Sequence, residues 1–451
     1  MLRRKIETKI EDYLTSDSNK ILVVDGARQI GKSFIIRHVG QKLFANYIEI
    51  NMEKDKQRDR LFADANSVES FYLALSAIAG DKMHERENTL IFIDEIQAYD
   101  HLMTLVKFLK EDNRYTYIAS GSLLGVTLKK TQSIPVGSLS VLHMYPLDFE
   151  EFLWANGVGE MVIDEMRRSF ESRSSLPNAL HQVIMGHFRR YLLVGGLPDA
   201  VNTYLADHNI VKVREVQTNI YSLYIDDAAK YEQESLRKLK IQRIYQMVPS
   251  NMESRKKRIV VKDIEYKTGK RTSDYQNEFD YLISAGVVLD VNAISKPSYP
   301  LVQNAGKNLL KLYINDIGML TNILYRNNIK PILEDIASIN LGAVYETLVA
   351  QELKAHGYSL FYYDNKKNGE VDFLIDDSDN LTTLPLEIKS GKDYTVHSAL
   401  SHFVDTSEYN IHQAFVLSNE SRIFIDQKTI YMPIYNIMFF DANRQPDQLY
   451  F

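Results

Sequence analysis

The chain has 451 residues, of which 45% are hydrophobic and 25% are charged, as is typical of a globular protein with several domains. It contains no cysteine, which excludes disulfide bonds and thiolate metal sites. The formal net charge of −6 excludes a general attraction to nucleic acid or to an anionic membrane, so any such binding needs a local basic patch. The N-terminal sequence lacks the apolar segment of a secretion signal, and the apolar runs are too short for a transmembrane helix. We therefore expect a cytoplasmic protein without a membrane partner.

Strand-like and helix-like patterns alternate over about the first 150 residues. Apolar strands are predicted at 20–25, 46–53, 89–95 and 115–122, with helical patterns between them. This alternation favours a mostly parallel sheet with helices on its faces. The pattern is then helical to about residue 235, and a second mixed α/β pattern begins near residue 308. The expected fold class is multidomain α/β.

The segment "GARQIGKS" at 26–33 fits the P-loop pattern and lies between a predicted strand and a predicted helix. Its two glycines allow the loop to turn its backbone N–H groups toward phosphates. The lysine is expected to reach the β- and γ-phosphates, and the serine hydroxyl to bind Mg²⁺. A glycine-containing turn with a chance lysine is the alternative. The residues expected to bind ATP are Gly26, Ala27, Arg28, Gln29, Ile30, Gly31, Lys32 and Ser33.

A second element of the nucleotide site is the apolar strand "LIFIDE" at 90–95, which ends in two acids. Asp94 is predicted to hold the metal through water, and Glu95 to polarise the attacking water. A strand of this kind is common by itself. Because it follows a P-loop, we expect ATP hydrolysis as well as ATP binding.

The segments "GARQIGKS", "FIDEIQ", "ASGS", "YPLDFEEF", "RRYLLVGGLPDAV" and "YSLYIDDAAKY" together resemble a large prokaryotic group of AAA-type ATPases with a C-terminal domain of unknown function. The resemblance covers nearly the whole chain. It implies an ATPase core at 1–155, a helical lid at 156–235 and a winged-helix-like segment at 236–305. It also implies that Ser120 is a polar sensor beside the γ-phosphate, and that Arg189 or Arg190 is a second sensor. A homo-oligomer promoted by ATP is expected of such a core.

The chain departs from this group just before "YPLDFEEF". The group usually carries Gly and a basic residue there, whereas this chain has Ser138. If that basic residue acts as an arginine finger, its absence puts in doubt hydrolysis across a subunit interface. Lys129, Lys130 and Arg114 are alternatives, and the sequence does not choose among them.

A basic segment at 254–271 contains eight Lys or Arg residues and two acids, in a chain that is acidic overall. It begins with Arg255, Lys256, Lys257 and Arg258. Such a patch is what a DNA-binding module needs to contact phosphates. A solvated loop or a protein docking surface has the same composition.

Charged residues interrupt two apolar strands predicted near the C-terminus. "GEVDFLI" at 369–375 contains Asp372, and "LPLEIKSGK" at 384–392 contains Glu387 and Lys389. Residues two apart on a strand point to the same face. Two acids beside a lysine can bind a divalent ion and stabilise charge on a phosphate. The alternative is that these acids only pair with lysines on the sheet.

Glu346, on a predicted helix before these strands, completes a set that resembles the PD-(D/E)xK nuclease fold. The resemblance implies a nuclease-like domain at 306–451 in which Asp372 and Glu387 hold Mg²⁺ or Mn²⁺, and it makes DNA a partner of this domain. We expect an ATP-driven protein that acts on DNA. The alternative is a nucleotide-dependent regulator or scaffold whose C-terminal domain only binds nucleic acid or protein.

Overall fold

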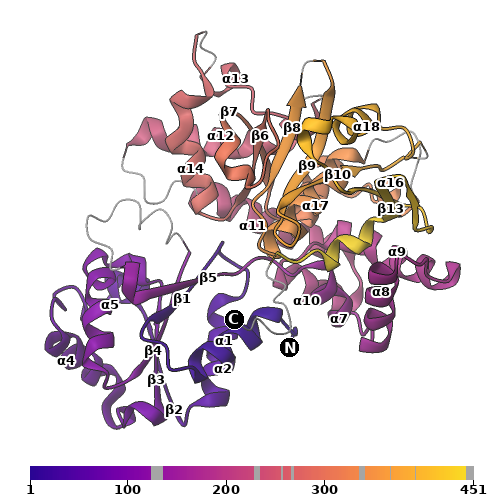
Figure 1. The fold of residues 1–451 in the computed structure, drawn as a ribbon. Helices are drawn as coiled ribbons and strands as arrows, with labels where there is room; N and C mark the ends of the chain where they lie inside the picture. Colours follow the sequence, from indigo (N-terminus) through magenta and orange to yellow (C-terminus); the bar gives the residue numbers. More distant parts are fainter. Residues whose placement is uncertain are drawn as a thin grey trace. The chain divides into compact units, whose positions relative to one another are not determined.

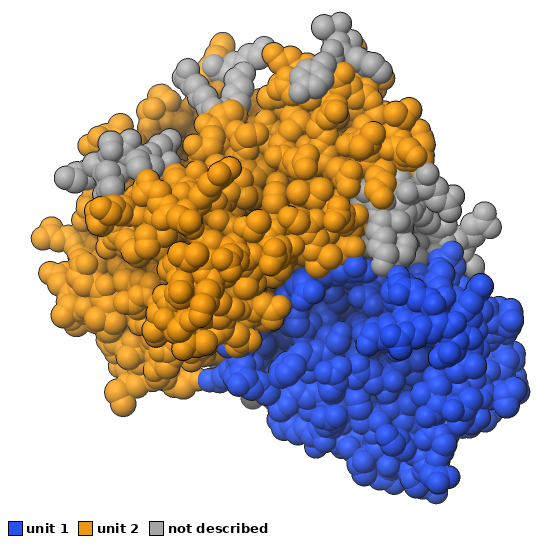
Figure 2. Space-filling view, turned by 180° about the vertical axis from the view of Figure 1, so that it is seen from behind, with its two compact units in different colours: residues 1–145, 284–286 blue, residues 146–283, 287–451 orange. Residues whose placement is uncertain are grey.

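The computed structural model describes residues 1–122, 136–227, 234–254, 257–265, 269–334, 341–365, 367–391 and 393–442. The chain divides into two compact units, which Figure 2 shows in blue and orange. Unit 1 contains residues 1–145 and 284–286, and unit 2 contains residues 146–283 and 287–451. Within the described ranges, no helix is both long and apolar enough to cross a membrane.

Unit 1 is built on a five-stranded parallel sheet in the order β2-β3-β4-β1-β5. Its strands are β1 (Ile21–Asp25), β2 (Asn46–Asn51), β3 (Thr89–Asp94), β4 (Thr116–Gly121) and β5 (Leu139–His143). Every residue of β1 and β3 is buried, because helices cover both faces of the sheet. The expected parallel sheet is thus confirmed.

The helices of unit 1 lie on the two faces of this sheet (Figure 1). They are α1 (Lys5–Thr15), α2 (Lys32–Leu43), α3 (Met52–Gln57), α4 (Val68–Ala79) and α5 (Asp100–Asp112). Helices α1 and α2 contact each other on one face, and α4 and α5 contact each other on the other. Strand β4 lies between β1 and β3, so their carboxyl ends meet at one edge of the sheet. That edge carries the P-loop, Asp94 at the end of β3 and Glu95 directly after it.

Unit 2 begins with helices that extend the helical region expected from the sequence. They are α7 (Phe149–Ala155), α8 (Glu160–Ser172), α9 (Asn178–Val194), α10 (Pro198–Asp207), α11 (Ile210–Asp227), α12 (Ser235–Glu253), α13 (Lys262–Glu265) and α14 (Gln276–Ser284). Four further helices accompany the sheet of this unit: α15 (Ile317–Tyr325), α16 (Lys330–Leu333), α17 (Gly342–Ala355) and α18 (Ser398–Asp405).

The sheet of unit 2 has eight strands of mixed direction in the order β12-β13-β11-β10-β9-β8-β6-β7. They are β6 (Val288–Ile294), β7 (Ala305–Ile314), β8 (Phe361–Asn365), β9 (Gly369–Asp377), β10 (Thr382–Ile388), β11 (Ala414–Ser418), β12 (Phe424–Asp426) and β13 (Thr429–Pro433). Strand β6 pairs with β7 and, in parallel, with β8. The strand that ends the segment 236–305 therefore belongs to the same sheet as the C-terminal strands.

Candidate active sites

The P-loop connects β1 to α2 and depends on its two glycines. Gly26 has φ +143°, and a Cβ there would lie 2.3 Å from the backbone oxygen of Met144. Gly31 directly precedes α2 with φ +93°. Positive φ of this size suits glycine and strains other residues. The sequence pattern therefore has the backbone geometry that a phosphate-binding loop requires.

Lys32 is buried in this loop. Its Nζ donates to the backbone oxygens of Gly26 at 2.9 Å and of Ala27 at 2.7 Å. Burial lowers the pKa of the ammonium, and the nearby Glu95 and Asp25 oppose this effect. The positive charge is thus held inside the loop by acceptors of its own backbone, and phosphate oxygens are acceptors of the same kind.

Asp94 is the centre of a hydrogen-bonded group at the carboxyl edge of the sheet. Its Oδ1 accepts from Ser33 Oγ at 3.1 Å and also from the Ser120 hydroxyl. Its Oδ2 accepts from Asn51 Nδ2 at 2.7 Å. The structure thus brings together the three residues that the sequence placed beside the γ-phosphate and Mg²⁺. The sequence analysis did not include Asn51 in this site, although a polar residue at the end of a predicted parallel strand indicates a position at this edge of the sheet.

Glu95 lies beside this group in the left-handed backbone region, with φ 54°. Its Oε2 accepts from Ser122 Oγ at 2.8 Å and from the Gln97 side-chain amide. Arg28 Nε donates to Ser122 Oγ at 3.4 Å. Sequence reasoning missed Ser122 and Gln97, which occur in the segments "ASGS" and "FIDEIQ". They hold the carboxylate that was predicted to polarise water.

In unit 2, Asp372 and Glu387 lie on the same face of the sheet. Strands β9 and β10 are antiparallel, with Leu386 opposite Phe373. The next pair in this register is Glu387 opposite Asp372, and opposite residues share a face. The backbone N–H of Ile388 donates to Asp372 Oδ2 at 2.8 Å.

Glu346 lies on α17 and is buried, and its charge acts on Asp372. We call Glu346, Asp372 and Glu387 the acidic cluster. Burial raises the pKa of Asp372 well above its ordinary value, and the charges of Glu387 and Glu346 raise it further. Burial also raises the pKa of Glu387, which Lys389 opposes from 2.9 Å.

Two residues from outside the predicted nuclease set contact Glu346 of the acidic cluster. Lys257 Nζ donates to Glu346 Oε1, and Tyr313 OH donates to Glu346 Oε2 at 3.1 Å. Burial lowers the pKa of the Lys257 ammonium, but Glu346 and Asp372 outweigh burial and hold it above its ordinary value. Lys257 belongs to the basic segment at 254–271, which was considered for DNA contact.

The donor set suits a hard divalent ion, because carboxylate oxygens are the ligands that Mg²⁺ and Mn²⁺ prefer. Glu387 Oε2 is buried and has no hydrogen-bond partner among the described residues. Within those residues, however, no group of three or more His, Cys, Asp or Glu side chains is arranged to hold a metal. The metal-binding role of Asp372 and Glu387 therefore stays a prediction, and Glu346 pairs with Lys257.

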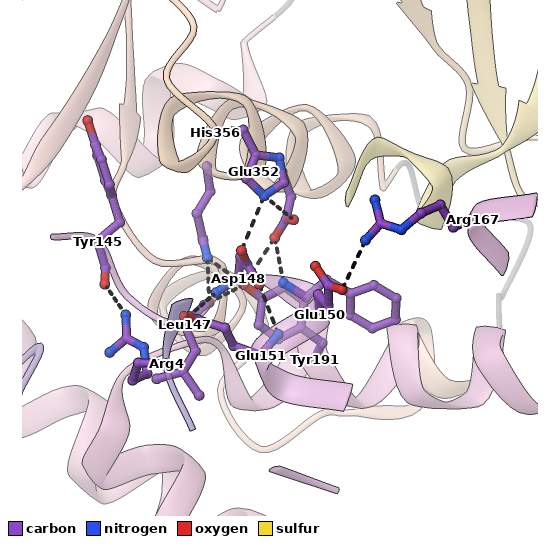
Figure 3. Close-up of polar contacts among 12 residues, drawn as sticks. Arg4, Tyr145, Leu147, Asp148, Glu150, Glu151, Arg167, Tyr191, Glu352 and His356 are labelled. Carbon is purple, nitrogen blue, oxygen red and sulfur yellow. Dashed lines mark hydrogen bonds and ion pairs between the residues drawn. The ribbon is translucent and has the colours of Figure 1, made fainter. Parts of the chain in front are cut away.

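Residues 146–152 of the segment "YPLDFEEF" form a buried polar junction within unit 2 (Figure 3). Asp148 caps α7, accepting from the N–H of Glu151 at 2.9 Å, and His356 Nε2 lies 3.2 Å from its other oxygen. Glu352 Oε1 accepts from the N–H of Phe149 at 2.9 Å. Since α17 carries both Glu352 and Glu346, this segment supports the helix that carries one member of the acidic cluster.

The segment "GGLP" makes a second buried contact in unit 2. The N–H of Gly196 donates to Asp316 Oδ2 at 2.7 Å, and a Cβ at Gly196 would lie 2.1 Å from the backbone oxygen of Leu147. Burial raises the pKa of Asp316 to about 6, although backbone N–H groups oppose this effect. Two segments that resemble the ATPase group thus have structural roles in unit 2.

The structure does not test the roles expected for the remaining basic residues. Arg189 and Arg190 lie on α9 of unit 2, so their role as a second sensor stays a prediction. Arg114 Nε lies 2.9 Å from Asp112 Oδ2, and Ser138 precedes β5. Four basic residues lie outside the described residues: Lys129, Lys130, Arg255 and Lys256.

Three family matches divide the chain. Residues 18–153 match a family described as an AAA domain. Residues 185–330 and residues 341–437 match two families that are each described as a domain of unknown function. A search of curated proteins gave no match.

Among solved structures, the chain is similar to a Walker-type ATPase of Pyrococcus abyssi, with 15% identity, a TM-score of 0.43, and coverage of 71% of this chain and 95% of that one. For the RuvB Holliday junction branch migration motor of Thermotoga maritima, the identity is 14%, the TM-score 0.28, and the coverage 64% and 89%. For the Saccharomyces cerevisiae Hsp104–ADP complex, the identity is 10% and the TM-score 0.29, with coverage of 79% of this chain and 43% of that one. Scores this low add nothing to the family matches. The chain thus carries an AAA-type P-loop domain at residues 18–153, followed by two domains of unknown function.

Proposed function

We propose that this protein binds and hydrolyses ATP and acts on DNA through a metal-dependent nuclease-like C-terminal domain. The observation that carries the nuclease proposal is the placement of Asp372 and Glu387 on the paired strands β9 and β10, where the N–H of Ile388 donates to Asp372 Oδ2 at 2.8 Å and Lys389 lies 2.9 Å from Glu387. Buried acids whose charges raise one another's pKa are costly to the fold, and such arrangements concentrate at functional sites.

For ATP, Lys32 and the loop N–H groups would bind the phosphates, and Ser33 with Asp94 would hold Mg²⁺. Glu95, held by Ser122 and Gln97, would accept a proton from the attacking water. Ser120, the expected sensor beside the γ-phosphate, donates to Asp94 and would orient this metal ligand.

In the C-terminal domain, Asp372 and Glu387 would hold Mg²⁺ or Mn²⁺. A bound divalent ion supplies an activated water molecule and offsets negative charge on the phosphate. Lys389 would stabilise the charge that develops on the phosphodiester, because its ammonium lies beside Glu387.

The test is incubation of the full chain with supercoiled and linear DNA, with Mg²⁺ or Mn²⁺, and with or without ATP. We expect cleavage that Asp372→Asn abolishes and that Asp290→Asn leaves intact. Asp290 is a matched control, since it pairs with Lys354 at 2.9 Å in the same unit, outside the acidic cluster. Metal-dependent cleavage that persists in Asp372→Asn would refute the site.

A regulator or scaffold is the second candidate, favoured by the lysines that already neutralise the acidic cluster. A regulator or scaffold of this kind is expected to bind DNA or another protein and to cleave no DNA, whichever divalent metal is added. In either case we propose a cytoplasmic protein with an ATPase core at 1–155, a lid at 156–235, a winged-helix-like segment at 236–305 and a nuclease-like domain at 306–451. ATP-promoted self-assembly, measured by light scattering with and without ATP, is part of this proposal.

A further inference from the structure

Lys257 and Arg258, shortly after α12, both contact acids of unit 2. Lys257 contacts Glu346, and the pair is largely buried, with side-chain exposures of 21% and 3%. Arg258 Nη2 lies 2.6 Å from Asp364 Oδ2 and 3.7 Å from Glu370 Oε2. Both residues thus have acidic partners within the protein.

The backbone at Lys257 is constrained by this arrangement. Its φ is +48°, which is uncommon for a residue other than glycine. Its N–H donates to Ser254 Oγ at 3.1 Å, and Arg258 lies over the Tyr362 ring at 5.5 Å. The neighbouring contacts therefore hold an unfavourable local conformation that directs the Lys257 ammonium to the acidic cluster.

The acidic cluster needs positive charge, because two of its three carboxylates, Glu346 and Glu387, are buried. Lys389 pairs with Glu387, and Lys257 pairs with Glu346. The charge of Lys257 also opposes the rise in the pKa of Asp372. A divalent ion bound by Asp372 and Glu387 would supply the same compensation. A second cation close to the Lys257 ammonium would be repelled by it, and this repulsion is strong where water is scarce.

We propose that Lys257 is a built-in counter-ion of the acidic cluster, and that a divalent cation displaces its ammonium from Glu346 when it binds Asp372 and Glu387. The second half rests on the proposed metal site, whereas the first half does not. A lysine side chain is long and flexible, so it can leave Glu346 while the strands stay folded.

The counter-ion role is tested without metal, by thermal unfolding in EDTA of Lys257→Met, Glu346→Gln and the double variant. Removing one partner of a buried pair leaves an uncompensated charge, so we expect Lys257→Met to lower Tm by roughly 6 °C or more. Adding Glu346→Gln should restore at least half of this loss. Lys354→Met with Asp290→Asn is the matched control pair and should show weaker coupling, because Asp290 is 24% exposed whereas Glu346 is 3% exposed. Additive losses in the Lys257 and Glu346 variants would overturn the counter-ion role.

Displacement is tested by calorimetric titration of the full chain with Mn²⁺ alone. We expect Lys257→Met to bind Mn²⁺ about tenfold more tightly than the wild type, because the repulsion is gone. Unchanged or weaker binding in Lys257→Met would overturn displacement. If neither protein binds Mn²⁺, the proposed metal site and the displacement are both wrong, and the unfolding experiment still decides the counter-ion role.

Discussion

The nucleotide site of unit 1 and the acidic cluster of unit 2 hold their carboxylates in different ways. Both acids of the nucleotide site accept hydrogen bonds from neutral groups. Asp94 accepts from the Ser33 hydroxyl and the Asn51 amide, and Glu95 accepts from the Ser122 hydroxyl. The acidic cluster has neutral donors as well, but two of its members, Glu346 and Glu387, also pair with ammonium groups. Neutral donors orient a carboxylate and leave its charge free for a cation. Ammonium partners neutralise it, and therefore link the site to the stability of the fold.

This contrast predicts that substitutions in the nucleotide site change function with little effect on stability. Glu95→Gln is expected to lower ATP turnover about 1000-fold, because the amide cannot accept a proton from water. ATP binding and Tm should stay near the wild-type values. Phosphate release, calorimetry with ATP and thermal unfolding measure these quantities, and the exposed Glu87→Gln is the control. Equal turnover in the two variants would contradict the role of Glu95.

Lys32→Ala removes the cation that the P-loop holds. We expect ATP affinity to fall about 100-fold, since a charge-assisted contact with phosphate is lost. Lys42→Ala is a control on the same helix, where the lysine is exposed and lies 2.5 Å from Glu11. Binding of a fluorescent ATP analogue measures the effect. Similar affinities for the two variants would mean that Lys32 does not contact the nucleotide.

A buried acid of unit 2 should show the opposite behaviour, with an effect on stability. The pKa of Asp316 is raised to about 6 from an ordinary value of 3.8, so folding favours its protonated form. Its contribution to stability is therefore present at low pH and is lost as pH rises through 6. Relative to Asp316→Asn, we expect the wild type to lose about 2 kcal/mol of unfolding free energy between pH 4.5 and 7. Urea unfolding of both proteins measures this difference, and a constant difference would contradict the raised pKa.

The smallest expected effect concerns Asp372 in the absence of metal. Asp372→Asn keeps an acceptor for the N–H of Ile388 and removes repulsion by Glu387 and Glu346. We expect it to raise the unfolding free energy by about 1 kcal/mol in EDTA. A loss of stability on thermal or urea unfolding would show that the charge of Asp372 supports the fold, and the contrast between the two sites would fail.

The sequence by itself determined the nucleotide site in most of its parts. The P-loop is contiguous, and its conformation depends on local backbone angles at Gly26 and Gly31. Asp94 and Ser120 end neighbouring strands of a parallel sheet, where strand direction alone brings them to one edge. Asp372 and Glu387 were predictable for a similar reason, because a short connection between two strands sets which face each residue occupies.

Only the tertiary structure decided which partners these charges have. Lys257 and Glu346 are 89 residues apart, and Asn51 and Asp94 are 43 apart. A basic segment has the same composition whether it faces solvent, DNA or an internal acid. The choice depends on the cost of leaving buried carboxylates without a counter-charge, and that cost exists only once α17, β9 and β10 have brought the three acids together.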